Sequence, residues 1–147
     1  MSVLTKVFVE EIRKIEETQF SEINRMPCRL THHLMPPAGW LNDPNGLCYF
    51  KGKYHVFFQY SPFEVKGGLK FWGHYSSKDL VNWNYEGTAL YPDSPMDCHG
   101  VYSGSALTKE DELHLFYTGN VKLDGDYDYI NNGRLTSTLH VKSEDGV

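Results

Sequence analysis

The chain has 147 residues, a formal net charge of −5, 40% hydrophobic residues and 14% aromatic residues. A chain of this length can hide roughly two-thirds of its unfolded surface, so an independent fold is possible. The acidic balance and the lack of a Lys- or Arg-rich run among the aromatics argue against a nucleic acid or a membrane as partner. No signal peptide precedes the main pattern, and no stretch reaches the ~18 apolar residues of a membrane span, which predicts a cytoplasmic protein.

The first segment, residues 3–24, has the spacing of an amphipathic helix. Glu10 stands four residues before Lys14, the spacing of a helical ion pair. We expect residues 1–28 to form a helical extension packed on the outside of a main domain that covers residues 29–147. One helical face carries the apolar side chains Phe8, Ile12, Ile15 and Ile23.

From Leu47 onward, short aromatic and β-branched runs alternate with turn signals, which predicts an all-β domain. The runs are LCYF, YHVFFQY, FWGHYSS, KDLVNW, VYSGSAL, LHLFYTG and TSTLHVKS. An internal repeat supports the interpretation, because YHVFF at residues 54–58 aligns with LHLFY at 113–117. A later match, HYSSKD with HVKSED, keeps the order. The offset between the two copies is 59 residues (113 − 54), and hairpin units repeated at this period are typical of β-propeller blades. The chain holds only about two such units, whereas a propeller has typically four to eight blades, so we expect it to be the front part of a longer protein.

The stretch GWLNDPNGLCYF combines a strong turn signal with polar and aromatic side chains. Pro44 disfavours helical backbone at the preceding residue, so we expect Asp43 to be extended and to end a strand before a turn at Asn45-Gly46. A carboxylate here could merely close an Asx turn. Trp40, together with the amides of Asn42 and Gln59, favours instead a carbohydrate site with Asp43 as nucleophile.

Three blocks carry a family resemblance: HLMPPAGWLNDPNGLCYFKGKYHVFFQYSP, FWGHYSSKDLVNW and VYSGSAL. In their order and spacing they resemble the N-terminal half of the catalytic propeller of glycoside hydrolase family 32, the family of invertases, sucrose-6-phosphate hydrolases, levanases and inulinases. The resemblance covers about residues 29–147 and implies part of a five-bladed β-propeller. It also implies an enzyme without a cofactor.

The resemblance assigns roles residue by residue. Asp43 falls on the aspartate that serves the family as nucleophile in a retaining mechanism. The substrate-binding positions of the family fall on Trp40, Leu41, Asn42, Gln59, Trp72, Tyr102 and Ser103. For the last three of these, a role in the packing of a blade is the alternative.

Two departures from the family pattern matter. The loop SPFEVKGGLKFWGH has glycines where many members carry an additional Trp, and in this it is more similar to bacterial sucrose-6-phosphate hydrolases. The downstream R-D-P and E-C blocks, which hold the transition-state stabiliser and the acid/base Glu, are absent from the sequence. Asp93 and Asp97 are poor substitutes for that Glu, because they stand in a turn-rich stretch where a solvated Asp is the default.

These patterns predict a β-fructofuranosidase that acts on sucrose or sucrose 6-phosphate, and the missing signal peptide favours the phosphorylated sugar. A truncated, non-catalytic sugar-binding protein, a fructan hydrolase and a fructosyltransferase remain alternatives. Lys66 and Lys70 could meet a sugar phosphate, although solvated surface lysines are commoner. The histidines and the three cysteines lack metal-ligand spacing, so no metal is expected, and the oligomeric state stays open.

Overall fold

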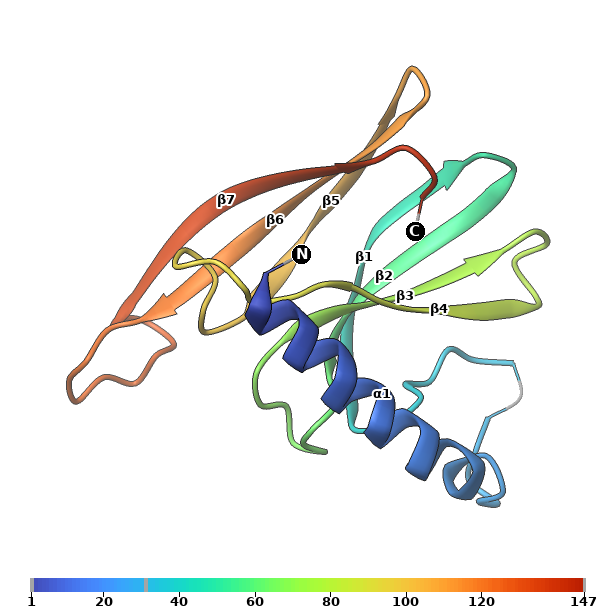
Figure 1. Cartoon of the computed structure of the whole chain (residues 1–147), viewed down its shortest axis with the longest axis horizontal. Coiled ribbons are helices and arrows are strands. Elements are labelled where there is room, and N and C mark those ends of the chain that lie inside the picture. Colours follow the sequence, from blue (N-terminus) through green and yellow to red (C-terminus); the bar gives the residue numbers. More distant parts are fainter. Residues whose placement is uncertain (1, 31, 147) are drawn as a thin grey trace.

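The computed structural model describes residues 2–30 and 32–146. A single helix precedes seven antiparallel strands in two sheets, one of order β1-β2-β3-β4 and one of order β5-β6-β7 (Figure 1). The elements are α1 (Val3–Ile23), β1 (Trp40–Phe50), β2 (Lys53–Ser61), β3 (Phe71–Ser77), β4 (Trp83–Leu90), β5 (Val101–Lys109), β6 (Glu112–Lys122) and β7 (Arg134–Ser143). The predicted all-β class with an N-terminal helix is therefore confirmed. Within the described residues, no helix has the length and apolar character needed to cross a membrane.

The internal repeat corresponds to two structurally equivalent hairpins. Strands β1 and β2 meet at a turn through Lys51 and Gly52, and β5 and β6 meet at the matching turn through Glu110 and Asp111. Lys51 and Glu110 both have positive φ, 45° and 56°, as tight hairpin turns demand. The third strands follow in the same order, so the first sheet is one blade and the second sheet contains the first three strands of the next.

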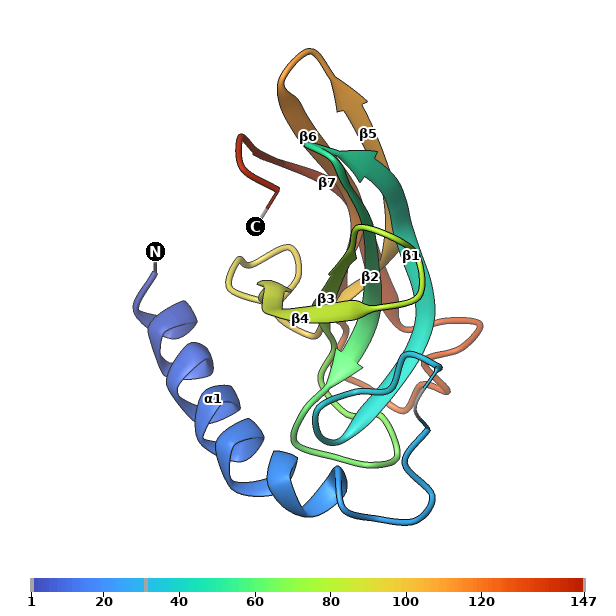
Figure 2. The ribbon, with the colours of Figure 1, turned by 90° about the vertical axis from the view of Figure 1, so that its right-hand side faces the viewer.

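Strand β2 is buried on both faces because its alternate side chains enter two different cores. Phe57 packs with Trp72 and side chains of the second sheet in a core between the two sheets. Phe58 and Tyr60 point the other way and pack under the helix. Figure 2 shows α1 on one side of the first sheet, while β5 and β6 rise above that sheet.

The helix packs as its apolar spacing predicts. Ile12 is buried in the core under the helix, and Phe8 meets Phe71 edge to face with ring centroids 5.1 Å apart. The predicted pairing of Glu10 with Lys14 is wrong: the i,i+4 ion pair in the described helix joins Arg13 and Glu17, 3.6 Å apart, on the exposed side. Ion pairs between exposed side chains contribute little free energy, so the i,i+4 spacing alone does not determine which charged residues pair.

Two strand boundaries differ from the prediction. KDLVNW is largely a turn, because the Asp79 carboxylate accepts backbone N–H bonds from Val81 (2.9 Å) and Asn82 (2.7 Å), and the fourth strand begins only at Trp83. Strand β1 also does not stop at Asp43. It continues through the proline and the expected turn to Phe50, and the turn residues form irregularities within the ladder with β2.

A half-buried carboxylate joins the helix to the sheet. Oε1 of Glu16 accepts hydrogen bonds from the hydroxyls of Tyr60 (2.9 Å) and Tyr85 (2.7 Å). Burial raises the pKa of Glu16, although both tyrosine hydroxyls act in the opposite direction. The carboxylate therefore supplies the acceptor for the hydroxyls of buried Tyr60 and half-buried Tyr85.

Replacing Glu16 with Leu is expected to lower the free energy of unfolding by about 1–3 kcal/mol, because two hydroxyls lose their acceptor. Glu16→Gln should cost less, since one amide oxygen can accept both bonds. Urea denaturation measures both changes, with Glu17→Leu on the exposed side of the helix as control. Equal losses in Glu16→Leu and Glu16→Gln would contradict the role of the shared oxygen.

The repeat also preserves a pair of stacked histidines. His55 Nδ1 lies 2.9 Å from His74 Nε2, and His114 Nδ1 lies 2.9 Å from His140 Nε2. His55 Nε2 faces the Phe50 carbonyl at 3.2 Å, so its N–H donates there and Nδ1 accepts from His74. The first pair is buried, and burial, followed by the neighbouring His55, lowers the pKa of His74 to about 4.

This pair predicts a loss of stability in mild acid. An unfolded histidine binds its proton near pH 6.5, whereas folded His74 resists it down to about pH 4, so the unfolded state gains protons first as the pH falls. The free energy of unfolding should decrease by about 2 kcal/mol from pH 7 to pH 5 through this residue.

Urea titrations at several pH values test this expectation with two matched variants. His74→Gln should weaken the dependence. His140→Gln, at the equivalent but exposed position of the second sheet, should leave it unchanged. Burial also lowers the pKa of His55, so a smaller dependence should remain in His74→Gln, and a dependence of undiminished size would refute the assignment.

Candidate functional site

Two β-bulges bring the candidate nucleophile and a serine from the next sheet together. The ladder of β1 with β2 skips Asp43 between Asn42 and Pro44, and the ladder of β5 with β6 skips Ser103 between Tyr102 and Gly104. Asp43 has φ 39°, in the left-handed region, so the expectation of an extended Asp43 at a strand end is wrong. A bulge leaves its extra residue unpaired and re-aims the side chain, which here directs the two side chains toward one another.

A chain of hydrogen bonds holds the Asp43 carboxylate. Ser103 Oγ donates to Oδ2 at 3.0 Å and accepts from Gln59 Nε2 at 2.9 Å, so Gln59 determines which way the serine proton points. Asn42 Nδ2 donates to Oδ1 at 2.8 Å, and Asn45 Nδ2 donates to the backbone carbonyl of Asp43 at 2.8 Å. The carboxylate is exposed, yet both of its oxygens are bonded, which is the arrangement of an oriented anion.

The structure brings together most of the predicted residues, but at different depths. Gln59, 5% exposed, lies beneath Ser103 and reaches it from β2. Trp72 is fully buried in the core between the sheets, and its indole N–H donates to the Tyr102 carbonyl at 3.1 Å. The indole ring therefore packs under the bulged segment of β5, which agrees with the alternative role for Trp72 in the packing of a blade. It exposes no surface to a ligand beside Asp43.

Trp40 and Leu41 are partly exposed at the start of β1. A glycine loop covers one part of the indole of Trp40, since a Cβ on Gly67 would lie 3.1 Å from the ring. The Lys70 ammonium lies 5.1 Å from the centre of the same ring. The loop at residues 67–70 thus places a cation against the tryptophan next to the site.

Asp93 and Asp97 serve the fold. Asp97 is fully buried and accepts from Tyr117 Oη at 2.9 Å and from the Ser94 N–H at 2.8 Å, so the expectation that it is solvated is wrong. Asp93 is exposed but accepts the hydroxyl proton of Thr5, which ties the start of α1 to the segment after β4. Among the described residues, no second carboxylate belongs to the hydrogen-bond chain of Asp43.

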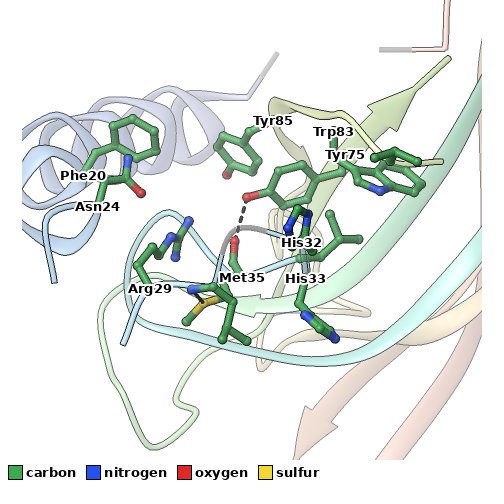
Figure 3. A pocket seen from close by; sticks show the side chains of 12 residues that line it. Phe20, Asn24, Arg29, His32, His33, Met35, Tyr75, Trp83 and Tyr85 are labelled. Carbon is green, nitrogen blue, oxygen red and sulfur yellow. Dashed lines mark hydrogen bonds between the residues drawn. The ribbon is translucent and has the colours of Figure 1, made fainter. Parts of the chain in front are cut away.

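A pocket of about 380 Å³ lies elsewhere, between the end of α1, the following loop and the outer strands (Figure 3). Tyr75 donates a hydrogen bond to the Met35 carbonyl at 2.7 Å at this pocket, and Trp83 and Tyr85 lie on the side of β4. None of the predicted site residues lines it. Over residues 2–30 and 32–146, no group of three or more His, Cys, Asp or Glu is placed to hold a metal ion.

The family model for the glycosyl hydrolases family 32 N-terminal domain matches residues 33–141, so the chain belongs to that family. It is 55% identical over 113 residues to sucrose-6-phosphate hydrolase of Bacillus subtilis, a match that covers 77% of this chain and 23% of the relative. With sucrose-6-phosphate hydrolase of Streptococcus mutans the identity is 49%, with the same coverage of both chains. The chain thus spans about a quarter of the length of these curated relatives.

Solved structures agree with this placement. The GH32 β-fructofuranosidase BmSUC1 of Bombyx mori superposes with a TM-score of 0.83 at 37% identity, over 97% of this chain and 28% of that one. The sucrose-6-phosphate hydrolase of Lactobacillus gasseri superposes with a TM-score of 0.79 at 37% identity, over 91% of this chain and 26% of its own. These two sheets are thus the corresponding part of the β-propeller of family 32, as the sequence predicted.

The bulge at Asp43 can be tested by its backbone. Because φ is positive there, Asp43→Gly should be more stable than Asp43→Ala by about 1 kcal/mol, although both variants lose the same side-chain hydrogen bonds. At Thr108, an exposed position in the regular part of β5, the order should reverse. Urea denaturation of the four variants measures both differences, and the same order at both positions would contradict the left-handed conformation.

Proposed function

We propose that this chain supplies the nucleophilic half of the active site of a β-fructofuranosidase and that sucrose 6-phosphate is the substrate. The observation that carries the proposal is the Asp43 carboxylate, exposed to solvent while Asn42 and Ser103 hold both of its oxygens. A nucleophile must meet the anomeric carbon in one geometry, and these bonds remove the rotational freedom that would oppose it.

The reaction would proceed with retention of configuration. An oxygen of the Asp43 carboxylate attacks C2 of the fructosyl unit and forms an ester bond, while the bond from C2 to the glycosidic oxygen breaks and that oxygen takes a proton from a general acid. Water then attacks C2 of the fructosyl ester and transfers a proton to the same group, which releases fructose and restores the carboxylate. A second carboxyl group about 5–5.5 Å from Asp43 is required, and the family resemblance assigns that role to the Glu of the E-C block.

The surrounding residues would orient the nucleophile and contact the sugar ring. Ser103, aligned by Gln59, donates to Asp43 and is placed to release that bond to the substrate as the carboxylate loses its charge. Trp40 would offer a partly exposed aromatic surface to the sugar ring. Solved structures of similar proteins include a complex with sucrose and a complex with 1-kestose, which supports a fructoside as the class of substrate. A cytoplasmic location stays a prediction.

Activity is best tested with this chain in two forms, alone and fused in place of the matching first part of the Bacillus subtilis enzyme, which restores the R-D-P and E-C blocks. The fused enzyme should release glucose 6-phosphate from sucrose 6-phosphate. Asp43→Asn should lower kcat by at least about 10⁴-fold, as expected for loss of a nucleophile. Asp111→Asn, in the exposed β5–β6 turn, serves as the charge-matched control and should retain full activity.

Mass spectrometry of the acid-quenched reaction should locate a fructosyl ester on the peptide that contains Asp43. An ester on another residue, or full activity of Asp43→Asn, would refute the nucleophile. A fused enzyme that folds, binds sucrose and does not hydrolyse it would favour the non-catalytic alternative. Release of kestose from sucrose in place of fructose would identify a fructosyltransferase.

A further inference from the structure

A cleft of about 440 Å³ lies between the loop at residues 67–70 and the ends of β6 and β7. Three cationic side chains from distant parts of the sequence line it: Lys70, Lys122 and Arg134. The backbone holds the two sheets together at this point, because the Val101 N–H donates to the Lys70 carbonyl at 2.9 Å. The cleft is therefore bordered by both blades.

The arrangement of these charges is unfavourable in the absence of an anion. Lys122 and Arg134 are direct partners in the ladder of β6 with β7, where like charges repel. Lys70 faces them from the first sheet: burial lowers its pKa, and the charges of Lys122 and Arg134 lower it further. The Glu64 carboxylate acts in the opposite direction but is the weakest of these influences.

No carboxylate neutralises the cluster directly. The ion pairs found between described residues all involve other groups, although the whole chain has a formal net charge of −5. The Lys70 ammonium donates to the backbone carbonyl of Gly68 at 2.8 Å and more weakly to that of Gly67 at 3.3 Å. Arg134 Nε is buried and has no hydrogen-bond partner among the described residues, so one N–H donor of the guanidinium is unsatisfied. An unpartnered buried donor beside two further cations is what a bound anion would satisfy.

The cluster is joined to the candidate active site by two aromatic rings. The Arg134 guanidinium lies 5.3 Å from the ring centre of Tyr102, the residue that immediately precedes Ser103. Lys70 lies 5.1 Å from the ring centre of Trp40. A ligand that touches these cations would therefore lie beside the rings of Trp40 and Tyr102, whose near neighbours in sequence, Asn42 and Ser103, hold Asp43.

We propose that Lys70, Lys122 and Arg134 form a subsite for the phosphate of a phosphorylated sugar whose fructosyl unit lies at Asp43. This inference rests on the proposed function and deepens it, because it names the part of the chain that distinguishes sucrose 6-phosphate from sucrose. The planar guanidinium of Arg134 would bind two phosphate oxygens, and the two ammonium groups would supply point charges. Lys66 takes no part, since it is exposed on the outer part of the same loop.

Binding to the full 147-residue chain gives a readout without turnover. By calorimetry, glucose 6-phosphate should bind more tightly than glucose or inorganic phosphate. Lys122→Gln and Arg134→Gln should each weaken binding of the phosphorylated sugars by about 10- to 100-fold and leave binding of sucrose unchanged. Arg134→Lys, which keeps the charge and guards against misfolding, should lose less. Lys66→Gln, which removes the same charge from the same loop as Lys70, should change nothing.

In the fused enzyme, the same variants should lower kcat/KM for sucrose 6-phosphate by a similar factor at unchanged kcat/KM for sucrose. Equal losses for both sugars, or an equal effect of Lys66→Gln, would overturn the subsite. Inorganic phosphate that binds as tightly as glucose 6-phosphate would also overturn it, because the site would then hold a free anion. Failure of the proposed function is a separate result, because Asp43→Asn would then remain active. The binding measurements would still show whether the cleft binds the phosphate group.

Discussion

Strand β2 has no face exposed to solvent, so its alternating side chains must satisfy two environments at once. Phe58 and Tyr60 complete the core under α1, and Phe57 completes the core between the two sheets. Gln59 shares the face of Phe57 and therefore points toward the second sheet, where an apolar side chain would be expected. Because its amide would be unsatisfied in that core, it bonds Ser103, and the same bond orients the serine toward Asp43. The packing of one strand thus places the site.

The bulges in β1 and β5 show how a repeated blade acquires a site that is not repeated. Both inner strands interrupt their ladders at nearly the same point, but the first offers an Asp and the second a Ser. In a regular strand, successive side chains point to opposite faces of the sheet, so the direction of each would be fixed by its neighbours in the strand. The irregularity turns both toward the space between the blades, and the indole of Trp72 supports the second bulge from within the core.

The same junction carries the cationic cleft. The loop before β3 and the ends of β6 and β7 belong to different blades, and they meet because the Lys70 carbonyl pairs with the first residue of β5. The rings of Trp40 and Tyr102 contact Lys70 and Arg134, and no ion pair joins these cations to Asp43 among the described residues. An anion-binding group beside a nucleophile is compatible with substrates that carry their charge on the leaving sugar.

Local patterns in the sequence determined the helix, most of the strands, the repeat and the residues around Asp43, because alternation, turn chemistry and motif spacing depend on neighbours along the chain. The fourth strand and the course of β1 through Pro44 were missed. A turn signal and a bulge use the same residue types, and only pairing with β2 decides between them. Trp72 was assigned to the site from its motif, whereas its depth depends on the second sheet. Lys122 and Arg134 carried no signal, since they stand far from Lys70 in sequence and only the docking of two blades gathers their charges.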